Sequence, residues 1–301
     1  LVDEKLKDVV LFNPYLDEVV TIDKKGRDNS ILSLWACSRH LSKLDFDVLI
    51  NLHPNERCSF IDAMTSVKLR TGTTHKIFKW FWDVFTPLDR SMHAADMYLD
   101  VLQQLGVQDL SNNGLEIFPG EEHFLEAELF WQEQNITDQD KLIGFNIGSA
   151  VPTKRWPPER FAEVADIFAA KGYKTVFFGG PMDEEMVAEA TGYMQTRPII
   201  ATGHFAIGGL AAAMRRCCLI ITNDSGPMHV AISQKVPIVA MYGPSNPKLY
   251  GPYTKDAVIV TAQPPCQGCA DGMKHSCDEL QCMSRMTVEQ VVAAAEKMLE
   301  K

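Results

Sequence analysis

An apolar run at residues 219–222 leads into Asn-Asp-Ser-Gly-Pro and then into an expected helix. The N-terminus of a helix presents free N–H groups and about half a positive charge, and ligands of parallel α/β sheets bind beyond the carboxyl ends of the strands. This order of residues is therefore typical of an anion-binding site. The residues that we expect to line it are Asp224, Ser225, Gly226 and His229. The alternative is a capped turn that binds no ligand.

Two further strand-to-helix loops carry residues that suit a nucleotide. The loop at 146–157, NIGSAVPTKRWP, contains Lys154, whose ammonium group can bind a diphosphate. The alternative for Lys154 is a solvated surface side chain. The loop at 179–185, GGPMDEE, has acidic residues that suit the helix dipole and that can also accept hydrogen bonds from ribose hydroxyls.

The elements that must position these loops alternate between strands and helices, which predicts an α/β fold. Apolar or alternating segments predict strands at 18–23, 46–52, 68–70, 142–147, 174–178, 199–200, 219–222, 238–242 and 258–260. Apolar residues at helical spacing predict helices at 1–12, 31–44, 59–66, 93–105, 158–170, 183–194, 207–215, 228–233 and 287–299. The strand at 46–52 is expected to be buried on both faces, as in a parallel sheet.

A connector at 118–136 interrupts the alternation, which favours two Rossmann-like domains in series over a single barrel. The first domain is expected at residues 1–138, the second at 139–286, and a C-terminal helix at 287–301 is expected to pack back on the first domain. The sequence starts at Leu1 within an expected helix, so we expect further residues upstream.

Length and charge exclude several classes of protein. The 301 residues, of which 46% are hydrophobic and 23% charged, exclude a small binding module and a collagen-like, coiled-coil or wholly disordered chain. The net charge of −10 argues against duplex nucleic acid as the main partner. Residues 1–140 hold 13 basic and 24 acidic side chains, whereas residues 141–301 hold 16 and 15. An anionic ligand is therefore repelled less by the second half.

In order and spacing, these segments resemble the bacterial ADP-heptose:lipopolysaccharide heptosyltransferases, a family of glycosyltransferases. The matching motifs of the second half are TKRWP at 153–157, TNDSGPMH at 222–229, YGPSNP at 242–247 and GPY at 251–253. The more diffuse matches of the first half are NPYLDEV at 13–19 and HAAD at 93–96. The resemblance implies the GT-B fold, with the nucleotide sugar held mainly by the second domain and the acceptor by the first.

The resemblance also implies roles for individual residues. Lys154 is similar to the family's diphosphate lysine, Ser149 to its phosphate-loop hydroxyl, and Glu184 to the acid that holds the ribose. Phe205 falls where the adenine is lined, or it is an ordinary core phenylalanine. The residues that match the loop and helix start around the diphosphate and sugar are Asp224, Ser225, Gly226 and His229. Of all these, Lys154 and His229 are the expected catalytic residues.

The reaction implied by the resemblance moves a heptose from ADP-heptose to the inner core of lipopolysaccharide with inversion. An acceptor hydroxyl attacks, ADP leaves, and positive charge develops on the sugar ring. The family's general base is an aspartate in the first strand-to-helix loop, which we expect upstream of Leu1. We expect no cofactor and no metal ion, and a cytoplasmic location with peripheral contact to the inner membrane as an option.

The acceptor side departs from the family pattern, because Met97 stands where many relatives have an arginine. Basic residues that can contact an anionic acceptor instead, or that are simply solvated, are Arg57, Lys68, Arg70, Lys76 and Lys79, and we select Arg57 as the acceptor residue. The segment 75–85, HKIFKWFWDVF, is expected to form a helix with one aromatic face. That face either packs between helices or lies on a membrane surface.

Four cysteines form a C-x₂-C-x₇-C-x₄-C pattern, namely Cys266, Cys269, Cys277 and Cys282. They can hold a structural zinc ion, or they are four reduced thiols.

Two rival functions stay open at this point. A sugar-nucleotide 2-epimerase also binds a nucleotide diphosphate between two Rossmann-like halves. A non-catalytic nucleotide-binding protein would need no general base.

Overall fold

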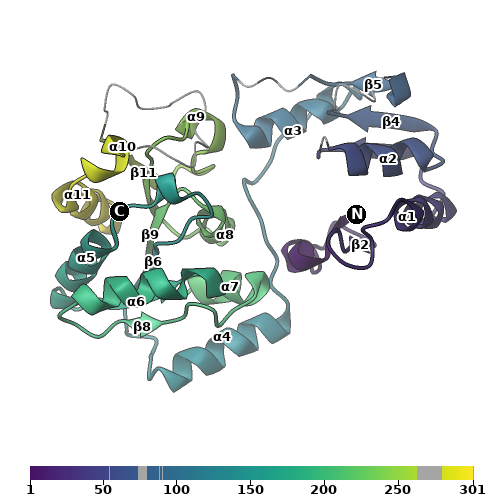
Figure 1. The fold of residues 1–301 in the computed structure, drawn as a ribbon. Helices are drawn as coiled ribbons and strands as arrows, with labels where there is room; N and C mark the ends of the chain where they lie inside the picture. Colours follow the sequence, from purple (N-terminus) through teal and green to yellow (C-terminus); the bar gives the residue numbers. More distant parts are fainter. Residues whose placement is uncertain (54, 74–79, 88, 90, 263–279, 301) are drawn as a thin grey trace. The chain divides into compact units, whose positions relative to one another are not determined.

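The structure, a computed structural model, describes residues 1–300 except 54, 74–79, 88, 90 and 263–279. It divides into two compact units (Figure 1). Unit 1 consists of Leu1–Lys7 with Glu18–Asn112, and unit 2 consists of Asp8–Asp17 with Asn113–Lys301. The main division therefore falls at residue 112, not at 138 as expected, because the connector packs with the second unit.

Unit 2 is built on a sheet of six parallel strands in the order β11-β10-β9-β6-β7-β8. The strands are β6 Leu142–Asn146, β7 Lys174–Phe178, β8 Ile199–Ile200, β9 Leu219–Asn223, β10 Ile238–Met241 and β11 Ala257–Val260. The chain winds outward from β6 in one direction and from β9 in the other. The strand order therefore reverses between β6 and β9, and such a switch point is where open α/β sheets bind ligands.

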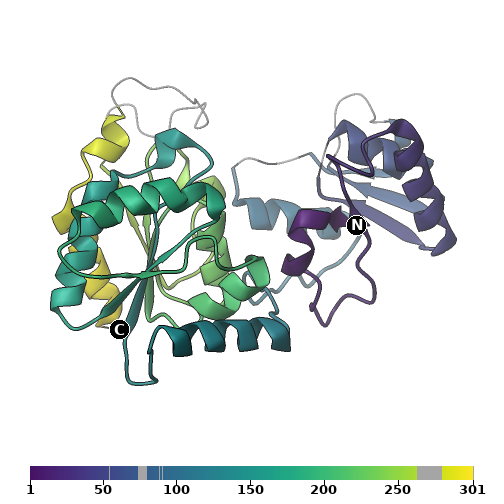
Figure 2. The same ribbon diagram turned by 60° about the horizontal axis from the view of Figure 1, so that its bottom comes forward.

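Helices cover both faces of this sheet (Figure 2). They are α4 Glu121–Glu133, α5 Pro158–Ala170, α6 Glu184–Tyr193, α7 Ile207–Met214, α8 Gly226–Ser233, α9 Pro247–Tyr250, α10 Gln281–Ser284 and α11 Val288–Leu299. Neighbouring strand residues enter opposite cores: Ile143 and Phe145 pack on the α5 and α11 side, whereas Leu142 packs on the α4 and α7 side. Burial on both faces explains why these strands are continuously apolar in the sequence.

Helix α11 corrects one expectation about the fold. It starts with a capping box at Thr287 and Gln290, and its apolar face buries Val288, Val291 and Ala295. This face packs on α5 and on β9, β10 and β11, all of which belong to unit 2. The helix therefore completes the second sheet's core, in place of the expected packing on the first domain.

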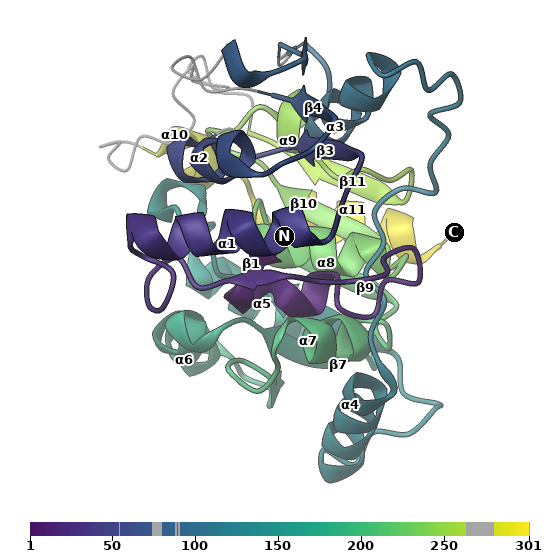
Figure 3. The same ribbon diagram turned by 90° about the vertical axis from the view of Figure 1, so that its right-hand side faces the viewer.

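Helix α4 packs on α7 through two glycines, which explains why the connector belongs to unit 2 (Figure 3). A Cβ atom added at Gly208 would lie 2.2 Å from His123 Cε1, and one at Gly209 would lie 2.2 Å from Glu126 Oε2. The His123 ring is itself fixed, because its Nδ1 accepts a hydrogen bond from the Gly120 N–H at 3.1 Å. The close packing of α4 on α7 thus requires glycine at positions 208 and 209.

This contact predicts opposite effects for two glycine-to-alanine changes. The methyl group added by Gly192→Ala in α6 would meet none of the described residues within 4 Å. The change should therefore stabilise the fold by about 0.5–1 kcal/mol through helix propensity. Gly208→Ala should instead destabilise it by about 1–3 kcal/mol, because the added methyl group overpacks against His123. Thermal unfolding of both variants measures this. An equal gain in Tm for the two would contradict the close approach of α4 and α7.

Unit 1 contains two small parallel sheets. The first pairs β1 Val2–Asp3 with β2 Thr21–Ile22, and the second has the order β3-β4-β5. The remaining elements are η1 Glu4–Val9, α1 Ile31–Lys43, β3 Val48–Asn51, α2 Glu56–Met64, β4 Leu69–Gly72, β5 Val84–Phe85 and α3 Ala94–Gln103. The helix expected at 1–12 is present only in part, because strand β1 is followed by the 3-10 helix Glu4–Val9.

Strand β3 is not buried on both faces as expected. It is the edge strand of its sheet within the described residues, and Val48 and Ile50 on one face are each 42% exposed. A groove of about 420 Å³ follows this strand and is also lined by Leu1 and Asp62. The apolar side chains of β3 therefore suit a buried strand, but the described residues leave one face of it exposed.

The aromatic helix expected at 75–85 is also wrong where the structure describes it. Val84–Phe85 form β5 and pair with β4, so these residues are extended. Trp80 is 76% exposed and stacks on Phe81 with ring centroids 3.7 Å apart. Residues 75–79 lie outside the described residues.

Candidate functional site

The loops that follow β6 and β9 are tied together at the switch point of the second sheet. Asn223 at the end of β9 donates its side-chain amide to the Ile147 carbonyl at 2.6 Å and accepts the Trp156 N–H at 3.1 Å. Trp156 is fully buried, and its indole N–H donates to the Met286 carbonyl at 3.1 Å. Both ends of the β6 loop are thus held by buried contacts, which fixes the residues between them.

Lys154 and Asp224 form a buried ion pair between these two loops. Lys154 Nζ lies 2.8 Å from Asp224 Oδ2, and the two side chains are 15% and 7% exposed. Lys154 closes the 3-10 turn Pro152–Lys154, and Arg155 fastens the loop by donating from Nε to the Ser149 carbonyl at 2.8 Å. The structure therefore excludes the alternative of a solvated surface lysine at position 154.

Ser149 lies in the same contact. Its side chain is 6% exposed, and its Oγ lies 3.4 Å from the Asp224 carbonyl and accepts the Val151 N–H at 3.3 Å. The structure thus brings Ser149, Lys154 and Asp224 together, although 75 residues separate the first from the last.

Helix α8 begins immediately beside the ion pair. Ser225 is its N-cap residue, in an extended conformation, but its side chain makes no capping hydrogen bond. Gly226 is exposed, and a Cβ atom added there would meet none of the described residues within 4 Å. His229 lies one turn further on and is half-buried. The start of α8 therefore combines an N-terminus without a side-chain cap with open space in front of Gly226.

The other two expected nucleotide residues lie along the same edge of the sheet, beyond β7 and β8. Glu184 starts α6, and a Cβ atom added at Gly203 would lie 2.7 Å from its Oε1. Gly203 has a φ of +74°, so the loop after β8 needs glycine for its backbone as well. Phe205 contacts Phe130 edge-on, with ring centroids 5.1 Å apart, at the margin of the core.

Two buried residues of this region lie in segments that the sequence marks as candidates, but neither was named as a site residue. Asp183 is 7% exposed, accepts the Gly180 N–H at 2.9 Å and fills the space that a Cβ at Gly148 would need. Tyr242 is fully buried and donates to the Tyr250 carbonyl at 2.7 Å; its pKa is raised by burial and then by the nearby Asp224 charge. The signals in the sequence were Gly148 and the YGPSN motif.

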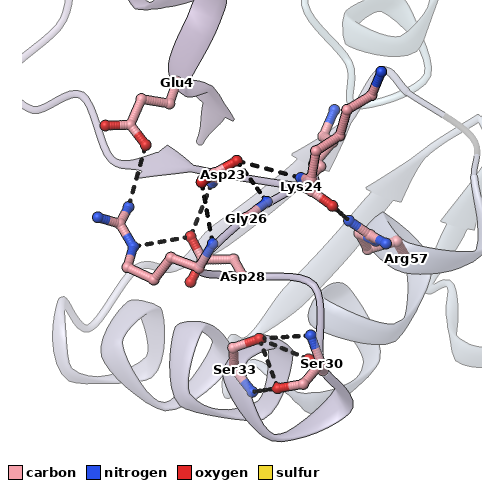
Figure 4. A network of polar contacts seen from close by, with 10 residues as sticks. Glu4, Asp23, Lys24, Gly26, Asp28, Ser30, Ser33 and Arg57 are labelled. Atoms are coloured by element: carbon pink, nitrogen blue, oxygen red, sulfur yellow. Dashed lines mark hydrogen bonds and ion pairs between the residues drawn. The ribbon is translucent and has the colours of Figure 1, made fainter.

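In unit 1, Arg57 holds a loop. Its guanidinium group donates to the Lys24 carbonyl (Figure 4). It also donates to Asn29 Oδ1 at 2.9 Å. The same loop turns around Asp23, whose carboxylate accepts the Gly26 N–H at 3.0 Å and other backbone N–H groups; these hydrogen bonds lower the pKa of Asp23. Any contact between Arg57 and an acceptor would have to use the remaining N–H groups.

The other basic residues considered for the acceptor are also engaged where the structure describes them. Lys68 pairs with Asp47 at 2.6 Å in an exposed ion pair, and Arg70 donates to the Thr65 carbonyl at 2.7 Å. Lys76 and Lys79 lie outside the described residues.

The cysteine pattern falls mostly outside the described residues, which include Cys282, a buried residue of α10, but not Cys266, Cys269 or Cys277. Among the residues described, no group of three or more His, Cys, Asp or Glu side chains could hold a metal ion. None of the helices in the described part of the chain is long and apolar enough to cross a membrane.

The fold is that of a two-unit α/β protein with parallel sheets, and the second unit has anion-binding features at its switch point. The chain belongs to glycosyltransferase family 9 (heptosyltransferase), because the model of that family matches residues 34–278. This confirms the resemblance and the fold class expected from the sequence.

Curated heptosyltransferases match the chain to different extents. It is 34% identical over 139 residues to lipooligosaccharide heptosyltransferase 2 of Haemophilus ducreyi, which covers 44% of this chain and 40% of that protein. It is 23% identical over 305 residues to lipopolysaccharide heptosyltransferase 3 of Escherichia coli K12, which covers 95% of this chain and 85% of that protein. The chain thus spans about two fifths of the length of the Haemophilus relative.

Solved structures of the family share the fold. A glycosyl transferase family 9 protein from Veillonella parvula DSM 2008 is 52% identical, with a TM-score of 0.94, and the match covers 99% of this chain and 87% of that one. The E. coli heptosyltransferase WaaC with ADP has a TM-score of 0.71 at 17% identity, over 99% of this chain and 89% of that one. At that identity the similarity shows the fold alone.

Proposed function

We propose that this chain carries the donor site of an inverting glycosyltransferase that moves a heptose from ADP-heptose to the inner core of lipopolysaccharide. The observation that carries the proposal is the buried Lys154–Asp224 ion pair beside the start of α8. A desolvated ammonium group next to backbone N–H groups is suited to a diphosphate, which is the charged part of a nucleotide sugar. Membership of a heptosyltransferase family supports the choice of sugar.

In this proposal, Lys154 and the N-terminus of α8 stabilise the departing ADP. Negative charge accumulates on the diphosphate as the glycosidic bond breaks, and a donor already aimed at that charge is worth about 3–4 kcal/mol. Asp224 holds the ammonium group in the loop before the donor binds. His229, one turn into α8, is placed to contact the donor beside the diphosphate, and Ser149 adds a hydroxyl to the same loop.

The nucleoside end of the donor would lie along the edge of the sheet toward β8. Glu184 would accept hydrogen bonds from the ribose hydroxyls, and Phe205 would line the adenine. Both belong to loops after neighbouring strands of the same parallel sheet, so one extended ligand can reach them from the ion pair.

We also propose that the general base belongs to a strand–helix unit that adds to unit 1. The support is the groove of about 420 Å³ along the exposed face of β3, which offers apolar side chains to a further parallel strand and its helix. Slow hydrogen exchange of those Val48–Asn51 amides that point away from β4, in a chain that carries this unit, against fast exchange in the chain without it, would support that addition. Equal exchange rates in both would contradict it.

The acceptor would bind to unit 1, with Arg57 as one contact to its anionic groups. The proposed enzyme uses no cofactor and no metal ion, and acts in the cytoplasm with peripheral contact to the inner membrane. Vesicle sedimentation with anionic lipids tests the membrane contact.

The test of the function is transfer of radiolabelled heptose from ADP-heptose to a lipopolysaccharide that lacks the inner-core heptose, catalysed by the chain together with the strand–helix unit proposed to carry the general base. We expect labelled lipopolysaccharide and ADP in equal amounts. Epimerisation of the donor, or release of free sugar with no acceptor product, would contradict the proposal.

Gly226 gives a second test that leaves the fold intact. Gly226→Ala places a methyl group in open space, so its free energy of unfolding should stay within about 0.5 kcal/mol of the wild type. The same methyl group would occupy space next to the diphosphate, and ADP affinity should fall roughly tenfold, equivalent to about 1.4 kcal/mol. Calorimetric titration of ADP measures this effect. Unchanged ADP affinity would show that the diphosphate does not bind at the start of α8.

A further inference from the structure

Asn146, the last residue of β6, is fully buried and links the two loops of the candidate donor site. Its side-chain Nδ2 donates to Thr222 Oγ1 at 3.0 Å and to Ser225 Oγ at 2.8 Å. Both hydrogens of the amide are therefore used on hydroxyl oxygens, one in strand β9 and one at the N-cap of α8.

These contacts decide which way each hydroxyl donates. Because each oxygen accepts from Asn146, its own hydrogen must point elsewhere. The Thr222 hydroxyl donates to the Asn223 carbonyl at 2.8 Å, whereas the Ser225 hydroxyl oxygen lies 3.4 Å from the same carbonyl. The Thr222 hydrogen is thus fully engaged, and the Ser225 hydrogen is held weakly.

The remaining polar atom of the side chain supports a functional role for this orientation. Asn146 Oδ1 is buried and has no hydrogen-bond partner among the residues that the structure describes. Buried polar atoms are normally paired, and an unpaired one is costly. If the amide were rotated by 180°, Oδ1 could accept hydrogen bonds from the two hydroxyls. Both hydroxyls, however, already have the Asn223 carbonyl as an acceptor.

We propose that Asn146 is a positioning residue that turns the Ser225 hydroxyl into a hydrogen-bond donor for the diphosphate of the sugar nucleotide. This rests on the proposed donor site and deepens it. Asn146 does not touch the ligand. It donates to one lone pair of the Ser225 oxygen, so that the Ser225 hydrogen points away from Asn146 and can meet an anionic oxygen at the start of α8.

A double-mutant cycle on ADP affinity, measured by calorimetry, tests this role. Asn146→Ala should weaken ADP binding about five- to tenfold in the wild type and less than twofold in a Ser225→Ala background. Asn146→Asp should weaken it further, because a carboxylate only accepts and would take the Ser225 hydrogen. Thr222→Val is the matched control: it removes the other hydroxyl and should leave ADP affinity within about twofold.

The outcomes separate this inference from the proposed function. Equal effects of Asn146→Ala in both backgrounds, with Ser225→Ala itself weakening ADP, would overturn the positioning role alone. An absence of ADP binding by the wild type would overturn the donor site as well. If Asn146→Ala does not fold, as judged by circular dichroism, the cycle with Asn146→Asp gives the same decision.

Discussion

Lys154→Gln is expected to lower kcat for heptose transfer by about 10²–10³-fold, as for the loss of one donor that stabilises transition-state charge. The change removes the ammonium group that we propose faces the diphosphate, and it leaves the loop's backbone contacts in place. Steady-state rates with ADP-heptose and a heptose-deficient acceptor measure the effect. A rate within about threefold of the wild type would show that Lys154 does not act on the departing ADP.

The same variant should also be less stable, which calls for a control. Asp224 is 7% exposed and would lose the cation that lies 2.8 Å away, and an uncompensated buried charge costs about 3–5 kcal/mol. The double variant Lys154→Gln/Asp224→Asn removes both charges and should regain most of that stability. It should not regain the rate. Recovery of both would mean that the pair only supports the fold.

Asp62→Asn is expected to stabilise unit 1 at pH 8 by up to about 3 kcal/mol and to have little effect near pH 4. Burial raises the pKa of Asp62 to about 6 from its ordinary 3.8, although Asn51 donates its side-chain amide to the carboxylate. Chemical unfolding of wild type and variant at several pH values measures the difference between them.

The sign follows from the direction of the shift. Between pH 3.8 and about 6 the folded state binds more protons at Asp62 than the unfolded state does, so the wild type loses stability as the pH rises through this range. Asparagine resembles the protonated acid and does not titrate, so the variant should lack this loss. A difference between the two proteins that is independent of pH would contradict the raised pKa of Asp62.

The second half of the fold could be predicted well from the sequence, because its strands are buried on both faces. Continuous apolar segments such as 142–147 and 219–222 have few alternatives to a parallel strand, and the loops after them carry the polar residues. The contacts themselves could not be predicted. The pairing of Lys154 with Asp224 depends on the strand order, which places β6 beside β9 across more than 70 residues of chain.

Packing across elements accounts for the predictions that were wrong. The spacing of the apolar residues in α11 predicts a buried face but not the domain against which it packs. That domain is shown only by the contacts of α11 with β9, β10 and β11. Residues 84–85 belong to a segment whose aromatic residues recur at helical spacing, but they pair with β4, because strand pairing overrides the local pattern. Asp183 and Asn146 lie in loops that the sequence marks as candidates, but neither was assigned a role of its own, since a single acid or amide at a strand end has no spacing that marks it.

The central claim is that the loops after β6 and β9 bind the diphosphate of a nucleotide sugar. The most direct measurement is calorimetric titration of this chain with ADP and, separately, with adenosine. The diphosphate contacts proposed for Lys154 and the start of α8 predict that ADP binds at least about 100-fold more tightly than adenosine, equivalent to about 2.7 kcal/mol. Equal affinities for the two, or no binding of ADP, would contradict the claim.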